Sequence, residues 1–248
     1  YSRKLEVRLE AESLRLRNQW NLGDWRDHVG QLQEASVALV LMDPPYGIRF
    51  QSDYRLDRRE EHRHEELEGD DEAAAAEVEA VMTALFPKLR EDGHVLCFTH
   101  WRTEEATKQA LERAGLTIRG SLVWDKKETG MGDVNTTFAP QYEHIIHAVK
   151  GSPLLFERQS DVLRYDREKS EWHPTQKPLP LLKRLLEVTT VEGELVVDPF
   201  GGVASTLVAA KELGRSFWGC ELGEVYHAYG RDRLVGIADR GRGSEEGS

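Results

Sequence analysis

Three short segments of this chain carry apolar side chains at nearly every position, not at every second one. They are Val37–Met42, His94–Thr99 and Glu194–Pro199. A strand with this pattern is buried on both faces, which is typical of a parallel sheet covered by helices. Segments of helical composition alternate with the strands, and right-handed crossovers place such helices on both faces of a sheet. The sequence therefore predicts an α/β fold around a mostly parallel sheet.

The rest of the pattern completes seven predicted strands and six predicted helices. We expect strands at residues 14–24, 37–43, 94–99, 118–125, 142–149, 194–199 and 217–221. We expect helices at residues 25–33, 73–90, 103–114, 178–189, 203–213 and 224–234. Residues 48–72 are predicted to be a mobile acidic loop, residues 150–172 a polar connection and residues 241–248 a disordered tail. Residues 1–240 then form a single domain.

The acidic character of the chain is concentrated in one segment. The net charge is −11, but residues 57–79 hold eleven acidic and three basic side chains, so the remainder carries only −3. This distribution is compatible with binding a polyanion, although the total charge gives no support for it.

The cysteines and the apolar runs indicate where such a chain resides. Cys97 and Cys220 each lie in a predicted buried strand, which favours reduced thiols in a cytoplasmic protein over a disulfide. The longest apolar run, Val37–Met42, is far shorter than the roughly 20 residues that cross a bilayer. No basic and apolar signal opens the sequence, so we expect neither secretion nor a membrane partner.

The segment Asp43-Pro44-Pro45-Tyr46 follows the first buried strand directly. Ligands of open parallel sheets bind outside the carboxyl ends of the strands. Two prolines remove two backbone donors, which leaves the Asp43 carboxylate, backbone carbonyls and the Tyr46 ring. Such hydrogen-bond acceptors beside an aromatic ring suit a flat molecule with an NH2 group. The structural alternative is a Pro-Pro strand end with Asp43 capping a turn.

The segment Asp198-Pro199-Phe200-Gly201-Gly202 ends another buried strand and precedes a helix. Glycines let backbone approach a ligand closely, and the helix start offers unpaired N–H groups. About twenty residues on, the next strand ends in Glu221, where an acid can accept both hydroxyls of a ribose. Without a G-x-G-x-x-G motif or a Walker lysine, a nucleoside cofactor that lacks phosphates fits better than a dinucleotide. The structural alternative is that Ser205 and Thr206 cap the helix.

The segment His173-Pro174-Thr175-Gln176-Lys177-Pro178 precedes a further helix. No second histidine or cysteine lies at ligand spacing from His173, so we expect no metal site. A proline-rich turn with Thr175 as a helix cap is the alternative interpretation.

Together, DPPY, HPTQKP and DPFGG in this order resemble the permuted, beta-type amino-methyltransferases of DNA. The resemblance covers the chain from about residue 18 to residue 234, and Gly23-Asp24, Trp124-Asp125-Lys126 and Glu143 agree with it. It implies a Rossmann-like sheet of seven strands whose last strand is antiparallel, with S-adenosylmethionine as the methyl donor. One departure is that Ala204 and Ser205 stand where the family commonly has a glycine and a threonine. The added methyl group predicts weakened cofactor affinity.

The resemblance also assigns site residues. The implied catalytic residues are Asp43, Pro44, Pro45 and Tyr46. The implied cofactor-binding residues are Asp24, Asp43, Thr175, Lys177, Asp198, Pro199, Phe200, Gly202, Ser205 and Glu221. Within this set, the DPFGG residues would line the methionine side, Glu221 would hold the ribose, Asp24 would lie near the adenine, and the HPTQKP residues near the carboxylate end.

Aspartate in DPPY favours adenine N6 as the target in family terms, and N4 of cytosine is the alternative. The expected partner is DNA, with the target base flipped out of the duplex to reach the site. In family terms, residues 150–172 are the small candidate recognition segment, in which the candidate DNA contacts are Lys150, Arg158, Arg164, Arg167 and Lys169. The other candidates are Arg49, Arg55, Arg58 and Arg59 after DPPYG. A homodimer is expected from the family. Two competing functions are methyl transfer to RNA or protein amides and a non-catalytic role in binding the cofactor or DNA.

Overall fold

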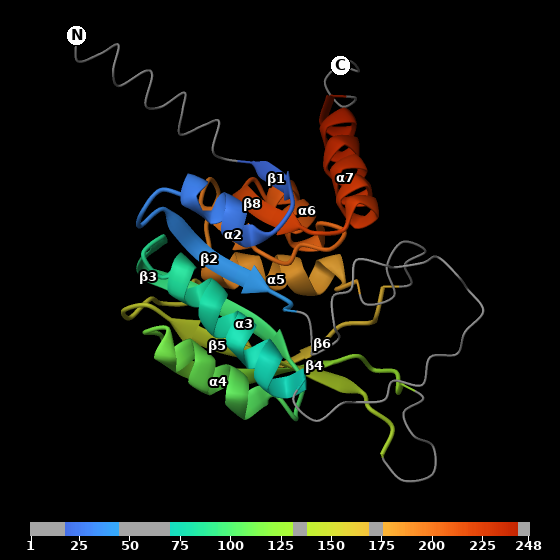
Figure 1. Ribbon diagram of the computed structural model, residues 1–248. Helices are drawn as coiled ribbons and strands as arrows, with labels where there is room; N and C mark the ends of the chain where they lie inside the picture. Colours follow the sequence, from blue (N-terminus) through green and yellow to red (C-terminus); the bar gives the residue numbers. More distant parts are fainter. Residues whose placement is uncertain (1–17, 45–69, 131–137, 169–175, 243–248) are drawn as a thin grey trace.

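The structure is a computed structural model that describes residues 18–44, 70–130, 138–168 and 176–242. Its strands form one sheet in the spatial order β1-β8-β7-β2-β3-β5-β4-β6 (Figure 1). They are β1 (Gln19–Leu22), β2 (Val37–Met42), β3 (Leu89–Thr99), β4 (Thr117–Asp125), β5 (Tyr142–Val149), β6 (Val162–Arg164), β7 (Leu195–Asp198) and β8 (Ser216–Glu221). β5 is antiparallel to both of its neighbours, and the other pairs are parallel. The predicted mostly parallel sheet is confirmed.

Helices cover both faces of this sheet, as expected (Figure 1). They are α2 (Trp25–His28), the short 3-10 helix η1 (Val29–Gln31), α3 (Asp70–Leu85), α4 (Glu104–Arg113), α5 (Leu179–Thr189), α6 (Ser205–Glu212) and α7 (Glu224–Arg242). β2 supplies side chains to two apolar clusters in alternation. Val40 and Met42 pack with α3 and α4, whereas Leu39 and Leu41 pack with α5 and α6. Because β2 is buried on both faces, it is apolar throughout.

The sheet differs from the expectation in strand number and in the place of the antiparallel strand. The extra strand is β6, which pairs with β4 at the sheet edge. It has three residues and one buried side chain, Leu163, so it leaves no periodicity to detect. The antiparallel strand is β5, the fifth along the chain and not the last. No helix connects β4 to β5 in the described residues, and antiparallel neighbours need no crossover helix.

The boundary between α3 and β3 also differs from the prediction. The helix expected over 73–90 spans Asp70–Leu85, and the strand expected at residue 94 starts at Leu89. Leu89 is fully buried and pairs with Val37, which favours the sheet at this point. The backbone then bulges at Asp92, whose φ is 63°, before pairing resumes at His94. The end of the predicted helix thus overlaps the start of a buried strand, and the burial of Leu89 in the sheet favours the strand.

Other expectations fall partly outside the described residues. Of the predicted loop 48–72, residues 48–69 lie outside, and residues 70–72 already belong to α3. Of the predicted tail 241–248, α7 includes the first two residues, and the rest lies outside. Cys97 and Cys220 are free and buried, as predicted. Among the described helices, none combines the length and apolar character that a bilayer crossing needs.

Candidate functional site

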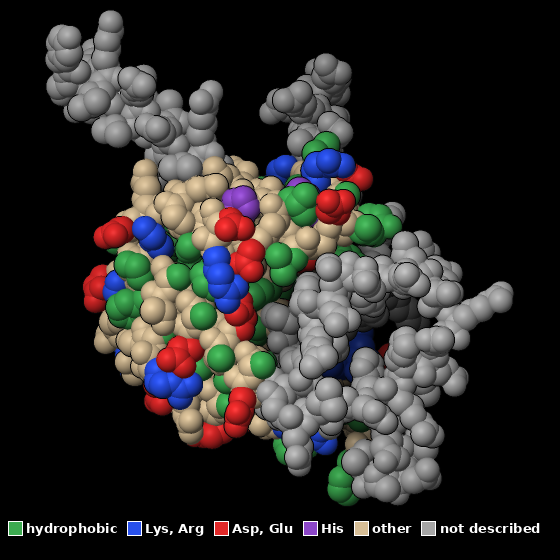
Figure 2. All heavy atoms as spheres, in the orientation of Figure 1, with side chains coloured by type: hydrophobic (Ala, Val, Ile, Leu, Met, Phe, Trp, Pro, Cys, Tyr) green, Lys and Arg blue, Asp and Glu red, His purple; other side chains and the backbone are tan. Residues whose placement is uncertain are grey.

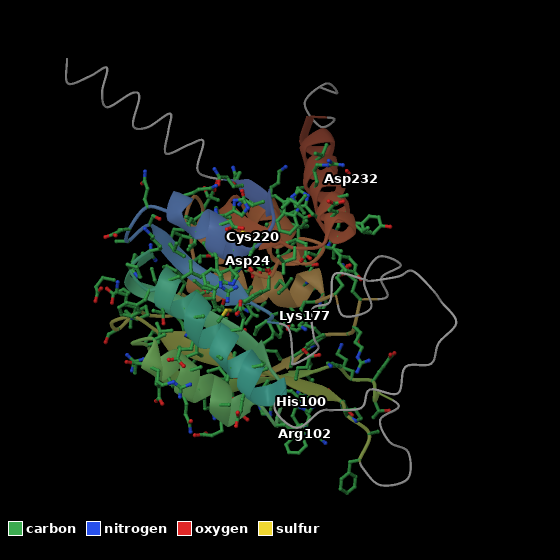
Figure 3. All side chains as sticks on the ribbon, in the orientation of Figure 1. Asp24, His100, Arg102, Lys177, Cys220 and Asp232 are labelled. Carbon is green, nitrogen blue, oxygen red and sulfur yellow. The ribbon has the colours of Figure 1, made fainter. Side chains whose placement is uncertain are left out.

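An acidic residue stands at the carboxyl end of each of four neighbouring parallel strands. In the spatial order of β1, β8, β7 and β2, these residues are Asp24, Glu221, Asp198 and Asp43. Parallel strands end at the same edge of a sheet, so the four carboxylates form a row there, which we call the acid row (Asp24 is labelled in Figure 3). A row of carboxyl groups along one edge suits a ligand that carries positive charge.

Glu221 is fixed by the turn that follows β7 and contains Gly201 and Gly202, which we call the glycine turn. One carboxylate oxygen, Oε2, accepts a hydrogen bond from the backbone N–H of Gly202 at 2.9 Å, and Oε1 accepts one from Gly223 at 2.8 Å. The backbone N–H of Leu222 also contributes a hydrogen bond, and since an ionised carboxylate offers about four acceptor sites, acceptor capacity remains for hydroxyl donors. Gly202 has a φ of 55°, and no described atom lies within 4 Å of the position that a Cβ would take. The turn therefore leaves open space beside an oriented carboxylate.

Asp198 is the most buried member of the acid row, with 4% of its surface exposed. Its Oδ1 accepts from the backbone N–H of Phe200 at 3.1 Å, and Thr206 adds a side-chain hydrogen bond. Burial raises the pKa of Asp198 to about 7, and the nearby charges of Asp43 and Glu221 act in the same direction. This carboxyl is therefore poised to ionise when a cation arrives.

Ser205 and Ala204 start α6 without a side-chain cap. The Ser205 hydroxyl accepts from Arg233 Nη1 at 3.0 Å, and the same nitrogen donates to the Val203 carbonyl at 2.6 Å. The alternative that Ser205 or Thr206 caps the helix is thus wrong, because both hydroxyls serve other partners. Ala204 has a left-handed φ of 61°, a conformation that glycine adopts without the penalty of a Cβ.

Asp24 lies at the other end of the acid row and caps α2. Its Oδ1 accepts from the backbone N–H of Arg26 at 2.8 Å, and its carboxylate pairs with the Arg26 guanidinium at 3.1 Å. Arg26 also pairs with Glu77 of α3 at 2.5 Å. Glu77, on a helix that is distant in sequence, therefore helps to hold Asp24 in place through Arg26.

Asp43 directly follows β2 and pairs with a buried lysine. The Lys177 ammonium lies 2.6 Å from Asp43 Oδ2 and 3.1 Å from Glu143 Oε2 (Lys177 is labelled in Figure 3). The neighbouring Pro44 is buried. Lys177 thus pairs directly with Asp43, a contact that sequence reasoning did not predict.

The structure brings together most of the expected site residues that it describes. The acid row, Pro199, Phe200 and Gly202 lie along one stretch of the sheet edge, with Lys177 beside Asp43. Pro45, Tyr46 and Thr175 lie outside the described residues. Sequence reasoning assigned no site role to Thr206, Glu143 or Lys126. The signal that existed was the agreement of Lys126 and Glu143 with the family resemblance.

The candidate recognition segment is divided between the two edges of the sheet. Lys150 donates to the backbone carbonyls of Phe86 and Leu89 at 3.2 and 2.9 Å, at the edge where β3 begins. Lys150 therefore stabilises the fold on the side opposite the acid row. Arg164 ends β6 and lies 3.5 Å from Asp125 at the edge where β4 ends. Of these two cations, only Arg164 shares an edge with Asp43.

Fold and site together define an α/β protein with a row of carboxyl groups at the carboxyl edge of its sheet. The match to the DNA methylase family of N6 and N4 methyltransferases extends over residues 37–232, and the chain belongs to this family. It is also 30% identical over 203 residues to YubD of Escherichia coli (strain K12), with 82% of this chain and 83% of YubD covered.

Solved structures show the same fold. TTHA0409 of Thermus thermophilus, in complex with S-adenosyl-L-methionine, matches with a TM-score of 0.67 at 20% identity, covering 88% of this chain and 93% of that one. The PvuII cytosine-N4-specific DNA methyltransferase matches with a TM-score of 0.70 at 17% identity, covering 88% and 86%. The predicted family and the S-adenosylmethionine-dependent methyltransferase fold are therefore confirmed.

Proposed function

We propose that this DNA methylase transfers a methyl group from S-adenosylmethionine to the exocyclic N6 of an adenine flipped out of DNA. The observation that carries the proposal is the position of Asp43, whose carboxylate lies at the end of β2 as one end of the acid row. The finer assignment to adenine is supported by aspartate at the first position of DPPY.

The acid row and glycine turn fit the proposed cofactor. S-adenosylmethionine carries a sulfonium and an ammonium group, which suit a row of carboxylates. Glu221 retains acceptor capacity for the two ribose hydroxyls after its bonds to Gly202 and Gly223. Asp24 lies one strand further, which supports a place for it near the adenine end. When bound, the cofactor supplies an electrophilic methyl group.

The residues around Asp43 support an in-line transfer to an amino group. The amine of adenine is a poor nucleophile, because its lone pair is delocalised into the ring. A carboxylate and a backbone carbonyl that accept its two N–H bonds favour a pyramidal nitrogen with a free lone pair. Pro44 keeps competing backbone donors away from this place, since proline has none. Asp43 then accepts the proton that the methylated nitrogen releases.

A turn after β3 offers a DNA contact that sequence reasoning did not identify. Trp101 is 57% exposed, and the Arg102 guanidinium lies 5.1 Å from its ring centroid (Arg102 is labelled in Figure 3). β3 is the neighbour of β2, so this turn lies at the same edge as Asp43. An exposed aromatic ring with a stacked cation suits bases and phosphates. By contrast, acidic and basic side chains are interspersed over the face that α2, α3 and α4 cover (Figure 2).

A second candidate target is N4 of cytosine. The observation in its favour is the similar fold of the cytosine-N4-specific PvuII enzyme. Both bases present an exocyclic NH2 group, so Asp43 would serve either one as an acceptor.

One experiment separates the two targets. Unmethylated DNA is incubated with the purified protein and S-adenosylmethionine, digested to nucleosides and analysed by mass spectrometry. We expect N6-methyladenine, and long-read sequencing of DNA from expressing cells gives its sequence context. N4-methylcytosine alone would transfer the assignment to cytosine, and no methylated base would favour a non-catalytic relative. The homodimer stays a prediction that light scattering tests.

A further inference from the structure

Asp43 is one end of a chain of four alternating charges that crosses the carboxyl edge from β2 to β4. The charge chain consists of Asp43, Lys177, Glu143 and Lys126, in that order. Lys177 bridges Asp43 at 2.6 Å and Glu143 at 3.1 Å. Glu143 continues to Lys126, whose Nζ lies 2.5 Å from Oε1. Each inner member thus contacts two opposite charges.

The charge chain lies against aromatic rings and is largely shielded from water. Lys177 Nζ lies 4.8 Å from the ring centroid of Phe98, and Lys126 Nζ lies 5.1 Å from that of Trp124. The side chains of Lys177 and Lys126 are 9% and 11% exposed, and that of Glu143 is 21% exposed. Coulomb energies are larger in such surroundings than at a solvated surface, so each charge affects its neighbours strongly.

The pKa values show how the neighbours act on one another. Burial alone would lower the pKa of Lys177, but Asp43 and Glu143 outweigh it and raise that pKa above its ordinary value. Burial alone would raise the pKa of Glu143, but Lys177 and Lys126 outweigh it and lower that pKa. Both inner members of the charge chain are therefore ionised at neutral pH.

We propose that Glu143 is a positioning residue for methyl transfer, because it shares the Lys177 ammonium with Asp43 and so preserves the strength of Asp43 as an acceptor. Without the charge of Glu143, Lys177 would neutralise Asp43 alone and draw its carboxylate away from the target amine. Lys126 pairs with Glu143 in turn and helps to keep its carboxylate ionised. This inference rests on the proposed role of Asp43 but holds for adenine and cytosine alike.

The test begins with Glu143→Gln, which keeps the shape and removes the charge. We expect kcat for methyl transfer to fall by roughly 10-fold to 100-fold, with KM for DNA and for S-adenosylmethionine changed by less than about threefold. Glu143→Asp keeps the charge and is expected to retain more of kcat than Glu143→Gln. The matched control is Glu194→Gln, which removes a carboxylate that pairs with Arg90 where β7 begins, at the opposite edge. It should lower the thermal midpoint and leave kcat unchanged.

A double variant separates positioning from mere stability. Glu143→Gln leaves Lys126 buried without its partner, so the thermal midpoint should fall as well. Adding Lys126→Met removes that unpaired charge and should recover the midpoint, while kcat stays low. Recovery of kcat together with the midpoint would show a purely structural role and overturn the inference, as would a wild-type kcat in Glu143→Gln. Absence of methyl transfer in the wild-type protein would instead refute the proposed function.

Discussion

Asp198 shows how a single buried carboxyl couples cofactor binding to pH. Its pKa is about 7 in the folded chain, against an ordinary value of 3.8, because burial and two neighbouring carboxylates disfavour the charge. Between these values the folded state holds a proton that the unfolded state has released. The contribution of Asp198 to stability therefore falls as pH rises from about 4 to about 7. Binding of a cationic ligand favours the ionised form of Asp198 and therefore opposes this loss of stability.

We expect Asp198→Asn to raise the thermal midpoint of the ligand-free protein at about pH 8 and to have little effect on it at about pH 4. Asparagine keeps an acceptor for Phe200 and Thr206 but never carries a charge. The affinity of the wild-type protein for S-adenosylmethionine should rise with pH through about 7, and that of the variant should be weaker and flat. Thermal melts and calorimetric titrations across this range measure both. Parallel affinity profiles of the two proteins would contradict the role given to Asp198.

Ala204 is a second residue whose environment makes a prediction. A left-handed backbone costs an alanine about 1–2 kcal/mol relative to its preferred regions. We expect Ala204→Gly to raise the free energy of unfolding by about 1 kcal/mol, as measured by urea denaturation. If the extra methyl also weakens cofactor binding, the same variant should bind S-adenosylmethionine more tightly. A lower free energy of unfolding would show that the methyl contacts outweigh the strain.

At the scale of elements, α7 approaches the glycine turn so closely that Gly230 has no room for a side chain. A Cβ at Gly230 would lie 2.9 Å from the Ala204 Cβ and 2.9 Å from the Trp20 ring. Trp20 also lies 2.5 Å from the position of a Cβ at Gly201. Gly201 therefore serves packing, whereas Gly202, which faces open space, is the glycine available to a ligand. The resemblance assigns cofactor binding to Gly202 alone of the two, and this role stays a prediction.

The exposed ring of Trp101 in the turn after β3 leads to a prediction about DNA binding. Loss of base stacking typically costs about 1–3 kcal/mol, so Trp101→Ala should weaken DNA binding by roughly 10-fold. Affinity for S-adenosylmethionine should not change, and Trp101→Phe should retain most of the DNA affinity. Leu154→Ala is a matched control, because Leu154 is 85% exposed in the segment that precedes β6. Fluorescence anisotropy with labelled DNA measures these affinities, and equal losses in Trp101→Ala and Leu154→Ala would refute the contact.

Sequence reasoning located strands and motifs better than it located contacts. The apolar run of β2 and the acids at the strand ends follow from local pattern, because burial on both faces and the turn after a strand leave strong signals. β6 and the start of β3 depend on pairing with distant strands, and no local window contains that information. The charge chain likewise joins Asp43 to Lys177 across a long stretch of sequence, so only the fold reveals it.

At the scale of the whole molecule, the sheet separates two tasks along one edge. The strands from β1 to β2 present the acid row. β5 and β4 contribute Glu143 and Lys126 of the charge chain, and the turn after β3 presents the exposed Trp101. Asp43 stands between these halves. This arrangement places the proposed cofactor on one side of Asp43 and the proposed DNA contact on the other. The net charge of −11 does not oppose DNA binding, because much of it lies in residues 57–79.

Asp43 is proposed to act on the target amine, while the other three members of the acid row suffice to hold the cofactor. The most direct measurement is a single-turnover assay of methyl transfer by Asp43→Ala, together with a calorimetric titration of S-adenosylmethionine. We predict that transfer falls by roughly 100-fold or more, whereas cofactor affinity stays close to that of the wild-type protein. Methyl transfer near the wild-type rate in Asp43→Ala would contradict the proposed role of Asp43.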